Sequence, residues 1–434
     1  MAVNANNIDT LNGFHKSIYG EELVDLIPEG VKLTKMIPFV KPNKRMGFDY
    51  KQPVSLQLEH GVTYGGTEGA AFSLNDAIPG ATREASIKGC EMVLRGQVSI
   101  GAISRSINDA ASYGRATKHV IKNLLISTHK KQEQMMFYGQ SGIAKIATDV
   151  EAVANGLVSA VEYNAGTTRT EVLIEAASFA PGIFAGGEGM KLDFTASLAV
   201  APVVLGKSIV KVDVRSKVLY FAGDQTASIV AEQFIFEGGA YGNECLGIEA
   251  MLSETSANVF GISTADYSLW NGNVYNLVTD GGESSAAPLS FDHVSKSIAD
   301  AVSKGLEGKL DLFVNPKTWS DLLSEQTAQR QFDSRYDTKK YENGAMSIVF
   351  YSQNGMIEIH SSTYVKEGIA FGLDLGCFER VGSSDVTFKI PGTNEDYMIK
   401  LQDYHALEYR TYCDLAIFCT ALGHNLLITG ISNS

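Results

Sequence analysis

The stretch CDLAIFCTALGHNLLITGI, residues 413–431, lies near the end of this 434-residue sequence and decides how its fold is read. Apolar or small side chains occupy the odd positions before and within it: Leu407, Tyr409, Thr411, Cys413, Leu415, Ile417, Cys419 and Ala421. Polar side chains occupy even positions: Glu408, Arg410, Asp414 and Thr420. A period of two residues predicts a β-strand with one buried face.

Cys413 and Cys419 share this predicted buried face. Six residues of strand span about 20 Å, whereas a disulfide requires Cα atoms within about 7 Å of each other. The same separation prevents the two thiols from sharing a metal ion. We therefore predict two small buried hydrophobic side chains and no redox or metal site in this stretch.

A membrane role is not expected from the sequence. The stretch at residues 413–431 is the most apolar part of the chain, but Asp414, Thr420, His424 and Asn425 interrupt it. A membrane-spanning helix needs about 18 or more consecutive apolar residues. The first residues, MAVNANNIDTLNGFHKSIYG, lack a basic segment followed by an apolar one, so we expect no signal peptide.

The composition is that of an ordered globular protein, with 44% hydrophobic and 20% charged residues. The length allows two or three domains. A formal net charge of -13 argues against general affinity for nucleic acid, although a local basic patch remains compatible with it. The 5 cysteines are scattered along the chain, which favours free thiols in a reducing compartment.

Residues 104–139, SRSINDAASYGRATKHVIKNLLISTHKKQEQMMFYG, predict a long helix. Apolar or small residues recur in steps of four and three, at Ile103, Ile107, Ala110, Gly114, Thr117, Ile121, Leu124 and Thr128. Ser104 or Ser106 is the expected N-cap, and Gly139 is the expected stop. Such a helix would be about 50 Å long. Its polar side is mainly basic.

The residues before this helix predict extended pieces. Residues 1–50 contain closely spaced prolines, and we expect an arm with one short helix near Glu21–Ile27. In residues 51–100, we expect PVSLQLEHGVTY and EMVLRGQVSIG to form a long hairpin with a glycine-rich tip. An isolated arm or hairpin cannot bury its own apolar side chains, so both imply a partner surface.

The second half predicts two further units. Short alternating segments at residues 151–275 predict a small barrel or sandwich. Residues 288–385 predict an α/β piece that follows a loop at 279–290. It contains a helix capped by Ser290 or Asp292, a buried strand KLDLFVNP, a second helix from about Lys317–Trp319, and a hairpin that turns at SQNG.

No catalytic, cofactor or metal site is predicted, and we expect a protein that is not an enzyme. The segment APVVLGKS, residues 201–208, resembles part of a phosphate-binding loop, but Ala201 replaces the first glycine and Pro202 lacks an N–H donor. His119 and His129 lie on nearly one face of the long helix without a carboxylate or thiol at ligand spacing.

The order of these parts resembles the major capsid proteins of tailed bacteriophages over nearly the whole chain. The closing segment YRTYCDLAIFCTALGHNLLITGI looks like the end of such proteins, and VFGISTADYSLWNGN (259–273) and KGLEGKLDLFVNPKTWSDLL (304–323) look like family segments around the A domain. The resemblance implies an α+β fold. Its expected parts are an N-terminal arm at 1–50, an E-loop hairpin at 51–100, a spine helix of the P domain at 101–150, a β-rich P-domain element or insertion at 151–275, an A domain at 276–385, and C-terminal P-domain strands at 386–434.

The resemblance also implies a function. Such proteins assemble into hexamers and pentamers that form an icosahedral head around double-stranded DNA. The implied partners are other copies of the chain, a portal, and possible scaffolding and cement or decoration proteins, with weak contact to packaged DNA and none to membranes. The implied location is the virion, after assembly in the host cytoplasm.

The hairpin and the helix supply the residues expected to act in assembly. We expect contacts between subunits at Tyr64, Glu68, Phe72 and Arg83. We expect the basic side of the spine helix, with Arg115, Lys118 and Lys122, to face the interior of the shell, where it would meet DNA or a scaffolding protein.

Three other functions fit parts of the sequence. An encapsulin-like shell of a cellular nanocompartment would share the fold, although such chains are usually shorter. A β-rich phage tail component or adhesin would use the barrel or sandwich. A nucleotide-binding enzyme would use the LGKS turn, and loss of nucleotide binding on Lys207→Ala would support it.

Overall fold

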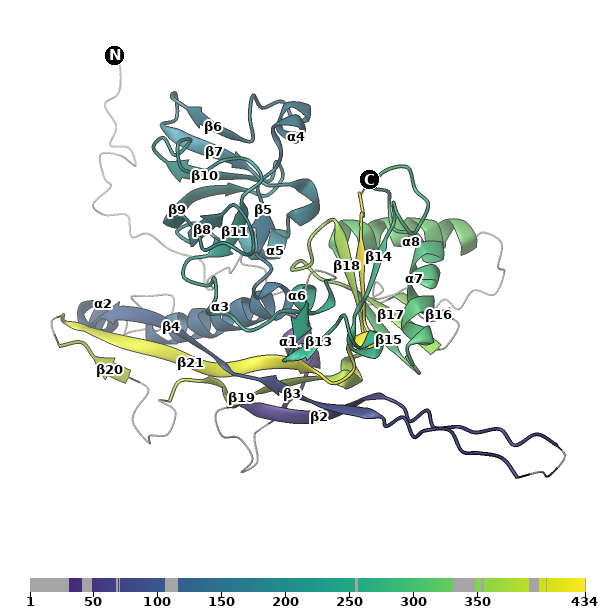
Figure 1. The fold of residues 1–434 in the computed structure, drawn as a ribbon. Coiled ribbons are helices and arrows are strands. Elements are labelled where there is room, and N and C mark those ends of the chain that lie inside the picture. The colour runs from purple at the N-terminus through teal and green to yellow at the C-terminus, as the bar shows by residue number, and fades with distance from the viewer. Residues whose placement is uncertain are drawn as a thin grey trace, which may run out of the picture.

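The computed structural model describes residues 31–40, 49–67, 69, 71–105, 116–253, 257–330, 348–352, 355–389, 398–402 and 404–433. They form a long central sheet, a barrel, an α/β unit and a projecting hairpin (Figure 1). No helix in these ranges is both long and apolar enough to cross a membrane.

The central sheet is built on the long strand β21, Ala406–Cys419. It pairs antiparallel with β4 along one side, and with β19 and β20 along the other side. The short strand β1 extends β19 in parallel. The remaining strands are β1 (Phe39–Val40), β4 (Cys90–Ser99), β19 (Phe378–Thr387) and β20 (Met398–Lys400).

Helix α3, Ala116–Tyr138, runs along this sheet, and the barrel lies on its other side (Figure 1). Helix α2 (Ile100–Arg105) follows β4 directly, and residues 106–115 between α2 and α3 lie outside the described residues. The N–H of Ala102 donates to Ser99 Oγ, so this helix begins earlier than the predicted cap at Ser104. Ser106 lies outside the described residues. The predicted stop is confirmed, because α3 ends immediately before Gly139.

Gly139 is required by close packing. A Cβ atom there would overlap the carbonyl oxygen of Cys245, so only glycine lets the end of α3 approach this segment. The N–H of Gly247 in turn donates to the Gly139 carbonyl. The end of the helix is thereby fixed against the chain that leads into α6, Ile248–Leu252.

The barrel is one antiparallel sheet in the order β5-β11-β8-β9-β10-β7-β6. A bridge between Ile146 and Ile174, next to β5 and β7, closes the sheet on itself. A small barrel is one of the two predicted architectures. Its elements are β5 (Ala144–Lys145), α4 (Asp149–Ala154), β6 (Val161–Asn164), β7 (Arg169–Leu173), α5 (Pro181–Phe184), β8 (Lys191–Thr195), β9 (Val204–Asp213), β10 (Val218–Ala222) and β11 (Phe234–Glu237).

The α/β unit contains a six-stranded sheet in the order β14-β22-β18-β15-β17-β16, with helices α7 and α8 packed against it and a core of its own. Ser290 caps α7, since its hydroxyl accepts the N–H of His293, and this predicted cap is confirmed. The elements are β14 (Asn273–Asn276), α7 (Phe291–Ser303), β15 (Leu310–Val314), α8 (Pro316–Arg330), β16 (Ile348–Ser352), β17 (Gly355–Ser361), β18 (Ile369–Leu373) and β22 (Leu426–Thr429).

Three predictions about chain organisation were wrong. The last strand, β22, was expected to join the P-domain strands, but it pairs with β14 and β18 in the α/β sheet. β19 begins at Phe378, so the central sheet takes up residues before 386. The partner of β2 (Tyr50–Gln57) is β3 (Ala81–Ile87), whereas β4, the predicted partner, pairs with β21. β4 pairs with β21, where Val98 of β4 and Tyr409 of β21 pack together against Leu124 of α3.

The predicted strand, with Cys413 and Cys419 on its buried face, is confirmed. Cys413 and Cys419 are free thiols, 2% and 0% exposed, on the buried face of β21. The alternation weakens after Leu415, where Ala416 and Phe418 are also buried because both faces are covered. Of the predicted arm, residues 31–40 and 49–50 are described, and the first range contains the short helix α1, Leu33–Met36. The helix predicted near Glu21–Ile27 lies outside the described residues.

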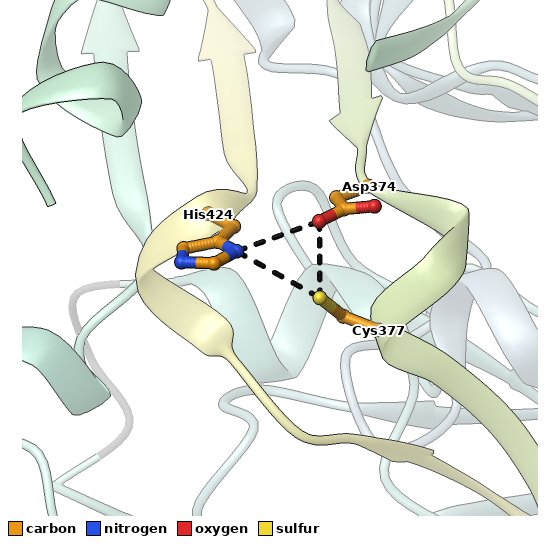
Figure 2. A group of neighbouring side chains, drawn as sticks. All are labelled: Asp374, Cys377 and His424. Atoms are coloured by element: carbon orange, nitrogen blue, oxygen red, sulfur yellow. Dashed lines mark hydrogen bonds and ion pairs between the residues drawn. The ribbon is translucent and has the colours of Figure 1, made fainter. Parts of the chain in front are cut away.

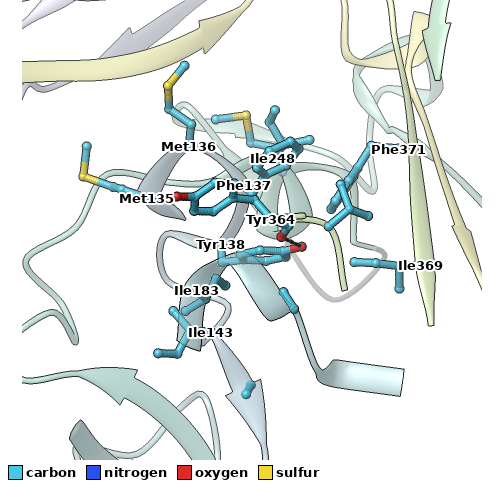
Figure 3. Close-up of a cluster of buried hydrophobic side chains, with 14 of the residues drawn as sticks. Met135, Met136, Phe137, Tyr138, Ile143, Ile183, Ile248, Tyr364, Ile369 and Phe371 are labelled. Carbon is cyan, nitrogen blue, oxygen red and sulfur yellow. Dashed lines mark hydrogen bonds between the residues drawn. The ribbon is translucent and has the colours of Figure 1, made fainter. Parts of the chain in front are cut away.

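The end of α3 lies in the main apolar core, where the barrel, the α/β unit and the central sheet meet (Figure 3). Phe137 packs against Phe371 of β18, with 5.3 Å between ring centroids. The fully buried Tyr138 hydroxyl donates to the Tyr364 carbonyl at 2.8 Å and accepts the N–H of Lys366 at 2.9 Å. These contacts fix the helix to the α/β unit.

We expect Tyr138→Phe to lower the free energy of unfolding of the unassembled protein by about 1–3 kcal/mol, because it leaves a buried carbonyl and a buried N–H unpaired. Denaturant unfolding would measure this loss. Tyr163→Phe on the barrel surface is the control, with a change within about 0.5 kcal/mol. Equal stabilities of the two variants would contradict the role assigned to Tyr138.

Candidate self-assembly surfaces

The hairpin extends well beyond the rest of the molecule between β2 and β3 (Figure 1). Large apolar side chains along it are exposed to solvent. We call this set the hairpin apolar surface: Leu58 (76% exposed), Val62 (59%), Tyr64 (89%), Phe72 (54%), Leu74 (80%) and Ile78 (49%). A segment that exposes so many apolar groups typically marks a protein–protein contact.

The two sides of the hairpin hold each other through few contacts. Beyond the paired strands, the N–H of His60 donates to the Ile78 carbonyl at 3.0 Å. The N–H of Asn75 donates to Thr63 Oγ1, and its side-chain amide donates to the Val62 carbonyl. The hairpin therefore has a defined path but no core of its own.

Two of the predicted contact residues lie in the hairpin apolar surface. Tyr64 is exposed, and the ring of Phe72 crosses the chain at Gly65, where a Cβ atom would overlap that ring. Glu68 lies outside the described residues. The sequence prediction missed Leu58, Val62, Leu74 and Ile78, although apolar residues within a glycine-rich segment were a visible signal.

Arg83, also predicted to contact a neighbouring subunit, is held at the hairpin base by its own chain. Its Nε donates to the Tyr267 hydroxyl at 2.9 Å, and the guanidinium lies 5.8 Å from the centre of that ring. The N–H of Ser86 donates to the Phe260 carbonyl close by. These contacts fix the direction in which the hairpin leaves the body.

The described part of the arm is bound by one buried carboxylate. Glu133 on α3 is 0% exposed and accepts the N–H groups of Lys32, Leu33 and Thr34 at 2.8–2.9 Å, and the Thr34 hydroxyl at 2.7 Å. Backbone N–H groups at a helix start favour a negative charge, so the carboxylate caps α1 from another element. The sequence analysis missed this role of Glu133.

The basic side of α3 is only partly available. Lys122 is exposed, whereas Lys131 forms an ion pair with Glu237 of the barrel at 2.7 Å. Arg115 lies outside the described residues, and the side chain of Lys118 is not described. Of the three lysine and arginine residues predicted to face the interior, the structure therefore locates the side chain of Lys122.

The described residues contain two clusters of possible metal-binding groups. In the first, the buried Asp311 contacts His360 Nε2 at 2.8 Å and Lys309 Nζ at 2.9 Å, and the same ammonium lies 2.8 Å from Glu358. Burial opposes ionisation of Asp311, but the hydrogen bonds from His360 and Lys309 outweigh it and lower its pKa. The lysine ammonium supplies the positive charge of this cluster.

The second cluster contains Asp374, Cys377 and His424 (Figure 2). The Cys377 thiol donates to Asp374 Oδ2 at 3.0 Å. Burial and the neighbouring carboxylate raise the pKa of this thiol to about 12. Since the reactive form of cysteine is the thiolate, the thiol in this state is a poor nucleophile.

The LGKS turn is part of a strand and cannot act as a phosphate-binding loop. Gly206 and Lys207 lie inside β9, and Lys207 is paired with Leu192 of β8. The N–H of Gly206 donates to the Asp193 carboxylate, so a negative group already occupies this donor. A phosphate-binding loop instead leads into a helix whose N–H groups remain free.

A cavity of about 410 Å³ lies between the barrel and the α/β unit. Lys366, one of the charged residues in its lining, is paired within the chain: Nζ contacts Glu249 at 2.7 Å and the Gly142 carbonyl at 3.1 Å, and it lies 4.2 Å from the centre of the Tyr138 ring. These contacts serve the packing of α3 and α6.

Comparisons with solved structures show the fold. The chain matches the "Cyanophage A-1(L) capsid asymmetric unit" with a TM-score of 0.57 and 11% identity, over 98% of this chain and 99% of the other. It matches the "Capsid of empty GTA particle" with a TM-score of 0.50 and 7% identity, over 98% and 99% of the two chains. The fold is that of tailed-phage capsid proteins.

A weaker match is the holo-SrpI encapsulin complex from Synechococcus elongatus, with a TM-score of 0.43 and 8% identity, over 99% of this chain and 96% of the other. No protein-family model matches the sequence. No curated protein matches it either.

We expect Glu133→Ala to release residues 31–40 from α3, because three N–H groups and a hydroxyl lose their acceptor at once. Trypsin should then cleave the unassembled variant after Lys32 or Lys35 at least about tenfold faster than the parent, since proteolysis follows the population of the open form. Mass spectrometry would identify the cleavage sites.

Asn123→Ala, at an exposed position on the same helix, is the matched control for this experiment. It should leave cleavage after Lys32 and Lys35 at the parent rate. Equal cleavage of Glu133→Ala and the parent would show that the arm is held by other contacts.

Proposed function

We propose that this chain, which has the fold of tailed-phage capsid proteins, is a structural major capsid protein that assembles into hexamers and pentamers of an icosahedral head around double-stranded DNA. In this proposal, the central sheet with α3 is the P domain, the α/β unit is the A domain, and the β2–β3 hairpin is the E-loop. Residues before β2 are the N-arm, and the barrel is an insertion in the P domain.

The hairpin apolar surface is the observation that carries the proposal. It exposes six large apolar side chains on a segment that the rest of the described chain does not cover. Burying a leucine or phenylalanine side chain is worth about 1.5–3 kcal/mol, so the free energy available from covering this surface is large. A shell protein gains this free energy by burying the apolar side chains against a neighbouring copy.

The polar clusters fit a structural role better than a catalytic one. Lys309 neutralises the carboxylates around His360, and Lys366 is paired with Glu249. The Cys377 thiol has a raised pKa. We therefore propose that the chain has no catalytic activity and acts by assembly.

The proposal includes partners and a location. Other copies of the chain are the main partner, with a portal and possible scaffolding and cement or decoration proteins. The net charge of -13 favours weak contact with packaged DNA, because most of the surface repels it. The place of action is the virion, with assembly in the host cytoplasm.

Imaging of the purified protein tests the proposed function. We expect the overexpressed chain to form rings or shells in negative-stain micrographs. Leu74→Asp should reduce the particle yield more than about tenfold, because it places a charge in a buried interface and each 1.4 kcal/mol lost is a factor of ten. Thr67→Asp, which adds the same charge at another exposed hairpin position, is the matched control.

A monodisperse monomer of the parent chain under all assembly conditions would contradict the proposal, as would equal particle yields for Leu74→Asp and Thr67→Asp. The contents of particles formed during infection separate a phage head from an encapsulin-like compartment. Nucleic acid inside supports the head, whereas an enclosed enzyme supports the compartment.

Lys122 tests the proposed contact with the interior. We expect Lys122→Glu to leave the particle yield unchanged and to reduce the uptake of scaffolding protein or DNA, because it reverses an exposed charge on α3. The DNA and protein content of purified particles would measure this. Lys211→Glu, an exposed position on the barrel, is the control, and full particles with normal content from Lys122→Glu would refute the assignment.

A further inference from the structure

Within the part of the chain that the structure describes, two crossings lead directly from one of the central and α/β sheets to the other, and they lie side by side (Figure 2). The first, residues 374–377, connects β18 to β19. The second, residues 420–425, connects β21 to β22. Asp374 and Cys377 belong to the first crossing, and His424 belongs to the second.

Hydrogen bonds from backbone N–H groups join the two crossings. The N–H of Thr420 donates to the Cys377 carbonyl at 2.9 Å, and the N–H of Asp374 donates to Asn425 Oδ1 at 2.9 Å. Asn425 is itself 0% exposed and donates to the Ala421 carbonyl. The positions of Asp374, Cys377 and His424 are therefore set by the fold and not by contacts among their own side chains.

Three different ligand atoms converge at this point. Cys377 Sγ lies 3.0 Å from Asp374 Oδ2 and 3.7 Å from His424 Nδ1, and His424 Nδ1 lies 3.4 Å from Asp374 Oδ2. Metal–ligand distances of about 2.0–2.3 Å in a tetrahedral zinc site place neighbouring ligand atoms about 3.3–3.6 Å apart. A zinc ion fits this triangle with shifts of a few tenths of an ångström.

We propose that Asp374, Cys377 and His424 bind a thiophilic divalent cation of the Zn²⁺ class, which joins the two crossings between the sheets. A thiolate, an imidazole nitrogen and a carboxylate oxygen are the ligands that zinc takes, whereas Mg²⁺ and Ca²⁺ require oxygen ligands. All three residues are half-buried, which leaves the fourth position to water. On binding, the thiol releases its proton to solvent and its sulfur coordinates the ion.

A hydrogen bond from the backbone orients the Asp374 carboxylate for metal binding. Asp374 Oδ1 accepts the N–H of Gly376 at 3.1 Å, which leaves Oδ2 directed toward the thiol and the imidazole. Such outer hydrogen bonds typically orient metal ligands. The cluster of Asp311, Glu358 and His360 differs, because the ammonium of Lys309 lies between its carboxylates at 2.8 and 2.9 Å.

Metal binding to the full-length purified protein tests the proposal. We expect one Zn²⁺ per chain after gel filtration, and Co²⁺ in its place should give the near-ultraviolet charge-transfer band of a thiolate ligand. Cys377→Ser and His424→Gln should each weaken Zn²⁺ binding by more than about 100-fold, since even outer contacts are worth 10- to 100-fold. Both variants should abolish the thiolate band.

Cys90→Ser is the matched control, because Cys90 is another half-buried thiol, bonded instead to the Asn243 carbonyl at 2.7 Å. It should keep both the stoichiometry and the band. Asp374→Asn, which retains the acceptor for Gly376, gives a second test if another variant fails to fold. Absence of bound Zn²⁺ in the parent, or an unchanged Co²⁺ spectrum in folded Cys377→Ser, would overturn the proposal, whatever the result of the assembly experiments.

Discussion

Pairing of β21 with strands on both of its sides is the constraint on which the structure depends. Leu415 lies opposite Cys90 of β4, and Ile417 lies opposite Arg380 of β19. The chain then turns and places β22 between β14 and β18. Residues 406–429 thus complete two sheets, and neither sheet can form in full until this last part of the chain has folded. Such distant pairing makes folding slow relative to a protein of local contacts.

Local features of this fold were predictable, and distant pairings were not. The alternation in β21, the Ser290 cap and the stop at Gly139 depend on neighbouring residues, and each was predicted correctly. The choice between β3 and β4 as the partner of β2 depends on a strand more than three hundred residues away. β22 likewise carries a short apolar pattern that fits either sheet, and only the turn after β21 decides where it lies.

The candidate sites also divide into those that depend on neighbouring residues, which were predictable, and those that depend on distant parts of the chain, which were not. Tyr64 and Phe72 were predicted because a glycine-rich hairpin with aromatic residues has nothing to bury them locally. Asp374 and Cys377 lie close to His424 in the fold, although Cys377 and His424 are 47 residues apart in the sequence. No spacing rule for metal ligands covers that distance. The role of Glu133 was missed, but the sequence carried a local signal for it. A carboxylate next to the apolar run Met135–Tyr138 needs a partner once it is buried.

The hairpin is fixed at its base and can adapt at its tip. At the base, Ser86 and Arg83 bond to Phe260 and Tyr267 of the body, so the direction of the hairpin is set by its own chain. Toward the tip, strand pairing ends at Gln57 and Ala81, and the apolar side chains have no cover among the described residues. A small bend there costs few internal contacts, because few exist. In the proposed shell, one chain must meet neighbours in rings of five and of six, and a fixed base with an adaptable tip meets both without rearranging the core.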